Sequence, residues 1–366
     1  MPIQGSANQF VCDLVAYEPG KPVEETAREL GLRPEEIIKL ASNENPLGPS
    51  PRAKEAMRAA IEEGQLYPDG GGWKLRHAVA GRHDLEIQNV VLGNGSNEII
   101  ELLCHCFLNR ETSLIAAEHA FVVYKLMATL FGANYVEVPD PGFVHDLDAM
   151  AEAITAETRL VFIANPNNPT GTLVGESQID RFMEKVPDHV VVVFDEAYHE
   201  FLEDAPDTVR YVREGRNVCV MRTFSKAYGL AGFRCGYAVA SADLVNYMNR
   251  VRAPFNVNSL ALAGALAALG DAEFIDRSVS MNRAEKDRLI EELSARGLTV
   301  VPSQTNFLLV DFGLPAGAVF QDLMRLGVIV RPMAGYGLLT HQRITVGTPE
   351  ENTKLLAAID ALLARD

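Results

Sequence analysis

The chain has 366 residues, of which 48% are hydrophobic and 22% are charged, a composition typical of a globular protein with a large core. This length exceeds the usual size of a single domain, so we expect two domains. The net charge of −16 makes nucleic acid and anionic membranes unfavourable partners, because like charges repel.

The cysteines and the apolar runs bear on the compartment. Five cysteines are scattered along the chain beside apolar residues, which indicates reduced thiols in a cytoplasmic protein. No apolar run reaches the roughly 18 residues of a membrane span, and no signal-peptide pattern opens the chain. Cys104, His105 and Cys106 lie in an apolar helical stretch, with no second cluster at zinc spacing. We therefore predict packed core residues there, no metal site and no membrane association.

The first strong helix signal runs from Ser50 to Gly64, with an N-cap serine, a proline in the first turn and a glycine at the end. Short apolar runs then alternate with amphipathic stretches. The predicted strands are residues 89–92, 112–116, 134–138, 160–164, 190–194, 218–221 and 236–240, with helices at 96–108 and 121–130 between them. Runs that are apolar without alternation are typical of strands buried on both faces. We predict an α/β domain over residues 46–270, with a mainly parallel sheet covered by helices.

A smaller α+β domain is predicted for residues 271–366. A long, charged, periodic helix over residues 271–296 ends at a glycine and leads into it. Its predicted strands are residues 299–301, 306–310, 328–331 and 343–346, followed by a helix from about residue 349. The N-terminal segment, residues 1–45, has no core of its own, so we expect it to pack on the small domain or on a dimer partner.

Four loops follow predicted strands, and ligands bind at the carboxyl ends of strands in an open parallel sheet. The first, Gly93–Glu98, leads into a helix whose N-terminal N–H groups can face an anion, although an ordinary tight turn explains this loop better when it is taken alone. The second, residues 165–171, is N-P-N-N-P-T-G, where Asn168 offers a side-chain amide.

The third and fourth loops add charged groups. Asp195 and Tyr198 follow the run V-V-V-V-F; a buried aspartate there needs a partner, or it is simply a helix cap. In the fourth loop, T-F-S-K-A-Y-G-L-A-G-F-R, Lys226 lies among small and apolar residues and Arg234 follows eight residues later. A lysine held in such surroundings has a lowered pKa and can act as an amine nucleophile, whereas a solvated lysine would not.

Together these loops offer what pyridoxal phosphate requires of a protein. Its aldehyde needs a lysine, its pyridine nitrogen a carboxylate and its ring oxygen hydrogen-bond partners, while its phosphate needs N–H groups, hydroxyls and an arginine. We therefore predict pyridoxal 5′-phosphate as the cofactor.

With these motifs assembled, the chain resembles the fold-type-I, class II pyridoxal-phosphate-dependent aminotransferases from about residue 17 to its end. The resemblance implies that Lys226 bonds the cofactor covalently and that Asp195 pairs with its ring nitrogen. Asn168 and Tyr198 are expected to hold the ring oxygen, and Phe121 to stack on the ring. The resemblance assigns the phosphate to Ser96, Asn97, Thr223, Ser225 and Arg234. The expected catalytic residues are Lys226, Asp195 and Tyr198.

Within that family, the segments L-A-S-N-E-N-P-L-G (residues 40–48) and Y-P-D-G (residues 67–70) are similar to histidinol-phosphate aminotransferases. This branch implies a homodimer in which Tyr67 reaches the partner's cofactor phosphate. The expected substrate residues are Tyr17, Asn45, Arg331 and Arg343. Arg331 and Arg343 lie on neighbouring predicted strands and suit a phosphate.

The resemblance implies the reaction of histidinol phosphate and 2-oxoglutarate to imidazole-acetol phosphate and glutamate, by a ping-pong mechanism. The alternative is an aromatic amino-acid aminotransferase acting on phenylalanine or tyrosine. Lys125, where a proline is usual, and His199, where an aliphatic residue is usual, leave the substrate pocket open between the two. A lyase or decarboxylase on the same fold and a non-catalytic cofactor-binding protein are the remaining alternatives.

Overall fold

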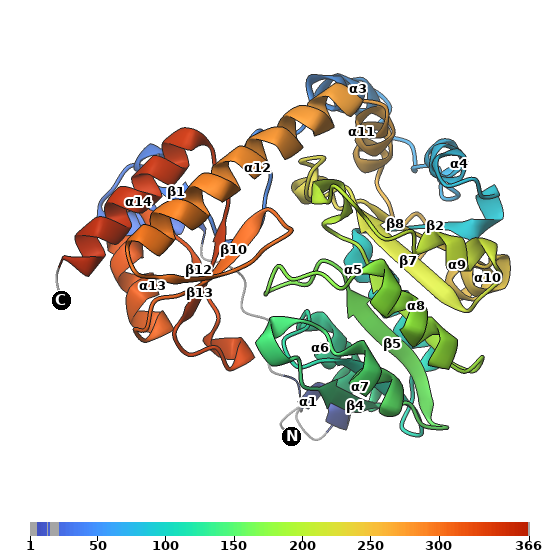
Figure 1. Ribbon diagram of the computed structural model, residues 1–366. Coiled ribbons are helices and arrows are strands. Elements are labelled where there is room, and N and C mark those ends of the chain that lie inside the picture. Colours follow the sequence, from blue (N-terminus) through green and yellow to red (C-terminus); the bar gives the residue numbers. More distant parts are fainter. Residues whose placement is uncertain (1–5, 13, 15–21, 365–366) are drawn as a thin grey trace.

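The large part of the molecule is built on a seven-stranded sheet (Figure 1). The computed structural model describes residues 6–12, 14 and 22–364. In spatial order the strands are β2 (Val90–Gly93), β8 (Gly236–Ala240), β7 (Val218–Thr223), β6 (Val191–Asp195), β5 (Thr158–Ala164), β3 (Ser113–Ala117) and β4 (Asn134–Val138). Strand β8 runs antiparallel to both of its neighbours, and the other pairs are parallel. The predicted α/β class with a mainly parallel sheet is confirmed.

Helices cover both faces of this sheet, which explains the apolar runs without alternation. In β5, Leu160 and Phe162 pack into one hydrophobic core, and Val161 and Ile163 pack into the other. The first core is completed by α5 (Ser96–Phe107), α6 (Val123–Phe131) and α10 (Ala242–Val251). The second is completed by α3 (Pro51–Ile61), α4 (Trp73–Arg82), α7 (Leu147–Glu152), α8 (Glu176–Lys185), α9 (Val209–Arg213) and α11 (Ser259–Leu269). Cys104 is buried in the first core, as predicted.

The long helix α12 (Ala272–Ala295) runs from beside α11 to a second, smaller unit (Figure 1). That unit holds an antiparallel sheet of β12 (Arg331–Pro332), β13 (His341–Thr345), β10 (Phe307–Asp311) and β9 (Thr299–Val301), in that order. Helices α13 (Ala316–Arg325) and α14 (Pro349–Leu363) pack with α12 around a core that includes Leu308, Ile344 and Leu355. The domain boundaries themselves stay a prediction.

One predicted strand was wrong in its extent. Residues 328–331 were expected to form a single strand, but they divide into β11 (Val328–Ile329) and β12, which belong to different sheets. Strand β11 pairs with β1 (Ile38–Lys39), whereas Arg331 of β12 pairs with Arg343 of β13. A strand that pairs with two different partners at its two ends must break between them.

The N-terminal segment contacts both units. Strand β1 pairs with β11, and Ala27 of α2 (Val23–Leu30) packs with Ile329, so this part lies on the small unit. The short helix α1 (Gln9–Cys12) instead contacts α6 of the large unit. Within the part of the chain that the structure describes, no helix is both long and apolar enough to cross a bilayer.

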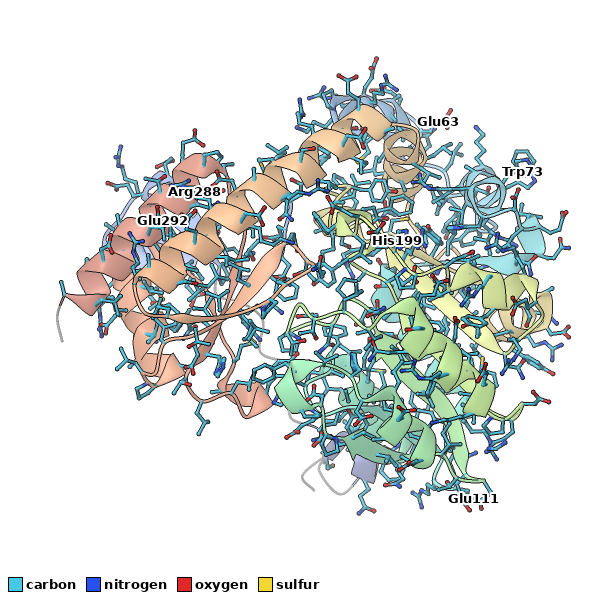
Figure 2. The ribbon with its side chains drawn as sticks, viewed as in Figure 1. Glu63, Trp73, Glu111, His199, Arg288 and Glu292 are labelled. Carbon is cyan, nitrogen blue, oxygen red and sulfur yellow. The ribbon has the colours of Figure 1, made fainter. Side chains whose placement is uncertain are left out.

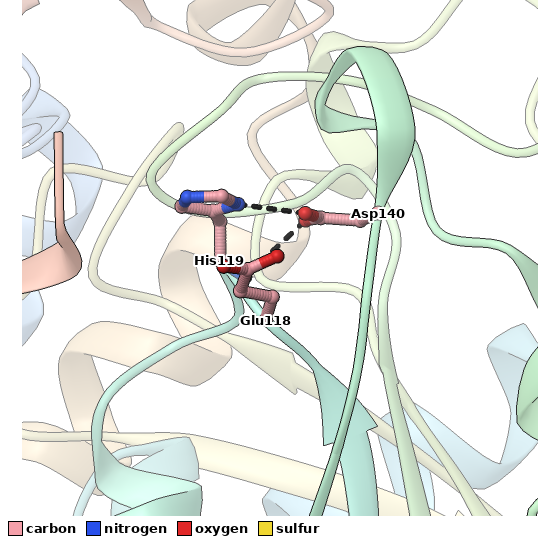
Figure 3. A group of neighbouring side chains, drawn as sticks. All are labelled: Glu118, His119 and Asp140. Carbon is pink, nitrogen blue, oxygen red and sulfur yellow. Dashed lines mark hydrogen bonds and ion pairs between the residues drawn. The ribbon is translucent and has the colours of Figure 1, made fainter.

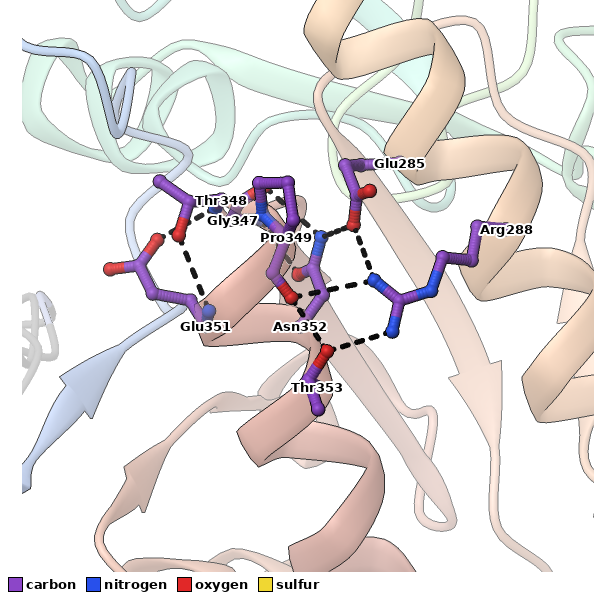
Figure 4. A network of polar contacts seen from close by, with 8 residues as sticks. All are labelled: Glu285, Arg288, Gly347, Thr348, Pro349, Glu351, Asn352 and Thr353. Atoms are coloured by element: carbon purple, nitrogen blue, oxygen red, sulfur yellow. Dashed lines mark hydrogen bonds and ion pairs between the residues drawn. The ribbon is translucent and has the colours of Figure 1, made fainter.

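A buried polar network joins α14 to α12 (Figure 4). The side chain of Asn352 donates to Glu285 Oε2 at 2.8 Å and to the Gly347 carbonyl at 3.0 Å, and accepts from the Gly347 N–H at 3.0 Å. Arg288 of α12 donates to the same carboxylate at 3.0 Å and to the Thr353 hydroxyl at 2.8 Å. Asn352 therefore satisfies backbone groups that water does not reach.

Replacing Asn352 with alanine is expected to lower the free energy of unfolding by about 3 kcal/mol, because three buried hydrogen bonds at about 1 kcal/mol each are lost. Urea denaturation of the cofactor-free protein measures this change. Thr353→Ala is the control: Thr353 is exposed, and its loss is expected to cost about 0.5 kcal/mol. Equal effects of the two substitutions would contradict the role given to Asn352.

Candidate active site

A cavity of about 590 Å³ lies where the carboxyl ends of the parallel strands face the small unit. Its lining includes the predicted residues Ser96, Asn97, Phe121, Asn168, Asp195, Tyr198, Thr223, Ser225, Lys226, Arg234, Arg331 and Arg343. These residues come from loops that are far apart in sequence. The position of the loops at one edge of the sheet brings them together, as expected for an open α/β sheet.

Lys226 follows β7 and projects into this cavity. Its Nζ donates to the Ser42 carbonyl at 3.2 Å and lies 5.6 Å from the centre of the Tyr198 ring. Burial, together with the charge of Arg343, lowers the pKa of Lys226 to about 7. The amine is therefore available in its neutral, nucleophilic form near neutral pH.

Asp195 ends β6 and is buried at the floor of the cavity. Its Oδ2 accepts from the Tyr124 hydroxyl at 2.7 Å, and its Oδ1 accepts from the Ala197 N–H at 3.3 Å. Burial raises the pKa of Asp195 to about 6, while the bond from Tyr124 opposes that shift. Such a carboxylate is well placed to pair with a cationic group that enters the cavity.

Tyr124 is a site residue that the sequence reasoning missed. It is fully buried on α6, and its ring stacks on Phe162 with centroids 4.4 Å apart. In the sequence it is one more aromatic residue in an apolar helix. The signal was its spacing, since Tyr124 lies three residues after Phe121 and would share a face with it in the predicted helix 121–130. The helix itself begins only at Val123.

Tyr198 and Asn168 both face the cavity, and each is already bonded to a residue from outside the large unit. The Tyr198 hydroxyl accepts from Asn43 Nδ2 at 2.9 Å. Asn168 Oδ1 accepts from Arg343 Nη1 at 2.6 Å. Asn43 was not predicted as a site residue, although it lines the cavity beside Glu44.

The end of the cavity nearest α5 is rich in hydrogen-bond donors. Helix α5 begins at Ser96, so its first N–H groups open toward the cavity. Arg234 Nη1 donates to Ser225 Oγ at 3.4 Å, and the Thr223 hydroxyl donates to the same oxygen at 2.9 Å. A Cβ built on Gly95 would lie only 2.4 Å from Arg234 Nη2, so the glycine leaves room for this arginine. The combination forms a cradle for an anion.

The opposite end of the cavity carries two arginines. Arg331 of β12 and Arg343 of β13 are direct partners in the antiparallel register, and both line the cavity. Arg343 Nη2 also donates to the Ala41 carbonyl at 2.9 Å, and its guanidinium lies 5.4 Å from the centre of the Phe307 ring. Two guanidiniums on adjacent strands suit a doubly charged anion such as a phosphate.

Two of the predicted site residues that the structure describes do not line this cavity. The Asn45 amide donates to the Ala227 carbonyl at 2.8 Å and to Ser278 Oγ at 3.0 Å, so it supports the loop that carries Lys226. Tyr67 is 82% exposed and stacks on Phe255 with centroids 4.7 Å apart. Tyr17 lies outside the described residues.

Among the described residues, Glu118, His119 and Asp140 form a group with metal-ligand spacing (Figure 3). His119 Nδ1 lies 2.6 Å from Asp140 Oδ1, and the His119 N–H donates to Asp140 Oδ2 at 3.3 Å. The bond to Asp140 raises the pKa of His119. His119 and Asp140 therefore bond directly to each other, and we assign no metal to this group.

Comparison with known proteins places this fold and site in one class of enzyme. The family model for aminotransferase class I and II matches residues 35–359. A histidinol-phosphate aminotransferase of Akkermansia muciniphila is 52% identical over 99% of this chain and 100% of its own length. Histidinol-phosphate aminotransferase 2 of Pseudomonas fluorescens is 49% identical over 98% of each chain.

A solved structure agrees with these sequence relatives. Histidinol-phosphate aminotransferase from Sinorhizobium meliloti, in complex with pyridoxal-5′-phosphate, has a TM-score of 0.90 at 26% identity, over 98% of each chain. The chain therefore belongs to the histidinol-phosphate aminotransferase family, within the class I and II aminotransferases. The predicted enzyme class and fold type are confirmed.

Proposed function

We propose that this chain catalyses transfer of an amino group between histidinol phosphate and 2-oxoglutarate, giving imidazole-acetol phosphate and glutamate, and that it runs from the imidazole-acetol phosphate side in histidine biosynthesis. The choice of substrate rests on one observation. Arg331 and Arg343 are paired on the adjacent strands β12 and β13, and both line the cavity. This pair suits the substrate's phosphate group. The opposite end of the cavity, beside α5, offers a separate set of hydrogen-bond donors for a second anion.

The residues of the cavity fit pyridoxal phosphate. When bound, this cofactor supplies an electron sink for the carbon that loses or gains a proton. We assign Lys226 to its aldehyde, Asp195 to its ring nitrogen and Phe121 to its ring face. Its ring oxygen is assigned to Tyr198 and Asn168, and its phosphate to Ser96, Asn97, Thr223, Ser225 and Arg234. The room left beside Gly95 for Arg234 supports this assignment.

Lys226 also carries the proton transfers in this proposal. With pyridoxal phosphate bound and its aldehyde engaged by the substrate, the freed Lys226 amine would accept and return the proton of the reacting substrate carbon. The lowered pKa of this amine suits a group that must both accept and donate protons near neutral pH.

The second candidate is an aromatic amino-acid aminotransferase. The observation in its favour is the apolar wall that Val123, Leu126 and Met127 contribute to the cavity, since such a wall accepts a phenyl ring as readily as an imidazole. In that case Arg343 would bind a carboxylate instead of a phosphate.

We also propose a homodimer. Large apolar side chains are exposed together along the end of α3, the following loop and the start of α4: Ile61, Leu66, Tyr67 and Trp73 are 59%, 61%, 82% and 59% exposed. Figure 2 shows Trp73 on the outer side of α4, away from the small unit. A patch of this kind is typical of a protein–protein interface. In such a dimer, Tyr67 reaches the partner's cofactor phosphate.

Alanine in place of Gly95 is expected to weaken pyridoxal phosphate binding about tenfold or more, because its Cβ displaces Arg234 and removes a charge-assisted hydrogen bond. Fluorescence titration of the cofactor-free protein measures the affinity. Gly215→Ala is the matched control, since Gly215 has the same φ of 77° with no atom near its Cβ position. Both variants are expected to lose stability, but only Gly95→Ala is expected to lose affinity for pyridoxal phosphate. A similar loss of affinity in both would contradict the cradle.

The pH dependence of cofactor capture tests the state of Lys226. Because its pKa is lowered to about 7, the neutral amine predominates above that pH and the ammonium below it. The rate of covalent capture by the cofactor-free protein should rise about tenfold per pH unit below pH 7 and level off above it. A rate that keeps rising through pH 9 would indicate an ordinary lysine.

Initial velocities test the proposed function as a whole. Varying histidinol phosphate at several concentrations of 2-oxoglutarate should give parallel lines in double-reciprocal plots, as a ping-pong mechanism requires. Intersecting lines would contradict this mechanism. Consumption of histidinol phosphate without formation of glutamate would instead favour a lyase.

A further inference from the structure

Three consecutive residues near the end of the N-terminal segment, residues 41–43, form hydrogen bonds to three residues of the proposed site. The Ala41 carbonyl accepts from Arg343 at 2.9 Å, and the Ser42 carbonyl accepts from Lys226 at 3.2 Å. Asn43 then donates from its side chain to the Tyr198 hydroxyl at 2.9 Å. Of the three, only Asn43 acts through its side chain, so its identity matters most.

Asn43 is held in place from several directions. It is 1% exposed and has a positive φ of 55°, a conformation that asparagine tolerates better than most residues. Its carbonyl accepts from Asn306 Nδ2 at 3.1 Å, and its N–H donates to the Thr345 hydroxyl oxygen at 2.9 Å. The side chain therefore leaves the backbone in one direction, toward Tyr198.

The directions of the hydrogen bonds follow from the donors available. The Thr345 hydroxyl accepts the N–H of Asn43 at 2.9 Å and donates its own proton to Asn43 Oδ1 at 3.3 Å. The oxygen of the amide therefore faces Thr345, and its NH₂ group faces Tyr198. An NH₂ group can only donate, so the Tyr198 oxygen must accept. The hydroxyl proton of Tyr198 is then left to point away from Asn43, on the side where Tyr198 lines the cavity.

We propose that Asn43 is a positioning residue which, together with Thr345, directs the hydroxyl proton of Tyr198 into the cavity and onto the ring oxygen of the bound cofactor. This inference rests on the proposed function, because it requires pyridoxal phosphate in the cavity. It gives β13 a second role: the strand that carries Arg343 also carries Thr345, the first donor of the chain Thr345–Asn43–Tyr198.

Reversing one hydrogen bond tests this chain. Asn43→Asp keeps the shape of the side chain, but a carboxylate accepts where the NH₂ group donated, so the Tyr198 proton turns toward residue 43. The ring oxygen then loses a donor and becomes more basic. The pH midpoint of the absorbance change of the lysine-bound cofactor should rise by about one pH unit, the size expected for one lost charge-assisted bond.

Repeating Asn43→Asp in a protein that already carries Tyr198→Phe separates this role from a general disturbance of the site. Tyr198→Phe alone should raise the midpoint by a similar amount, and adding Asn43→Asp should raise it no further. A shift from Asn43→Asp that persists without the Tyr198 hydroxyl, or no shift at all, would overturn the proposal. A wild-type protein that binds no cofactor through its lysine would overturn the proposed function first, so the two failures are distinguishable.

Thr345 supplies a second, milder test in case Asn43→Asp does not fold. Thr345→Val removes the donor that orients the Asn43 amide and should raise the midpoint in the same direction. Thr345→Ser keeps the hydroxyl and should retain the wild-type midpoint. Thermal unfolding of each cofactor-free variant shows whether it folds. Equal midpoints for the valine and serine variants would contradict the proposed chain.

Discussion

Replacing Lys226 with alanine is expected to lower the transamination rate by about four orders of magnitude or more. Among the described residues that line the cavity, Lys226 is the only lysine, so the substitution removes the amine placed to bond the cofactor's aldehyde and, with it, the group that moves the proton. Acid–base catalysis alone contributes about 10²–10⁴-fold, and the lost covalent step adds to that. Steady-state turnover of histidinol phosphate with 2-oxoglutarate measures the effect, together with loss of the absorbance of the lysine-bound cofactor.

Lys286 provides a matched control for this substitution. Lys286 is buried, its Nζ donates to the Ser303 carbonyl at 2.9 Å, and burial lowers its pKa as it lowers that of Lys226. It does not line the cavity. Lys286→Ala should therefore reduce stability and leave turnover within a few-fold of wild type. Substantial residual turnover in Lys226→Ala would remove the central residue from the proposed mechanism.

Asp195→Asn is expected to cause the second largest loss, about 10²–10⁴-fold in turnover. Asp195 is buried and would face the protonated ring nitrogen of the cofactor as its counter-charge. Removing one partner of a buried ion pair costs about 3–5 kcal/mol. If that loss falls on the transition state, the rate drops by the corresponding factor. The variant should still bind the cofactor through Lys226, so capture and turnover are measured separately.

Asp140→Asn is the control for a buried aspartate outside the cavity. Its carboxylate is bonded to His119, and its loss should lower stability with little effect on turnover (Figure 3). Asp195→Asn with nearly wild-type turnover would mean that the ring nitrogen is not protonated by this carboxylate, and the role of Asp195 would then be structural.

Much of the fold can be predicted from the sequence because strands of the central sheet that are buried on both faces appear as continuous apolar runs. The run at residues 160–164 is apolar throughout since alternate residues enter two different cores. The same logic places Asp195 and Lys226 at the ends of neighbouring strands, where a polar residue follows a buried run. The extent of the strand at residues 328–331 was predicted wrongly because an apolar run does not reveal which partner each of its residues pairs with.

The contacts that tune the site are harder to predict. Asn43 is held by hydrogen bonds to Thr345, which is 302 residues away, so no local pattern marks it. Tyr124 resembles an ordinary core aromatic until its hydroxyl is seen on Asp195. Asn45 lies in the same string as Asn43, L-A-S-N-E-N-P-L-G, but its amide supports a loop instead of facing the cavity. Sequence reasoning recovers residues by their chemical type, while the direction of each side chain depends on distant elements.

The most direct test of the central claim is a half-reaction without 2-oxoglutarate. Purified protein loaded with pyridoxal phosphate is mixed with histidinol phosphate or, separately, with phenylalanine, and the absorbance of the lysine-bound cofactor is followed. We expect rapid loss of that absorbance with histidinol phosphate and little change with phenylalanine, and Arg343→Ala should slow the first reaction. Faster loss with phenylalanine would contradict the assignment of the two arginines to a phosphate and would make the chain an aromatic aminotransferase.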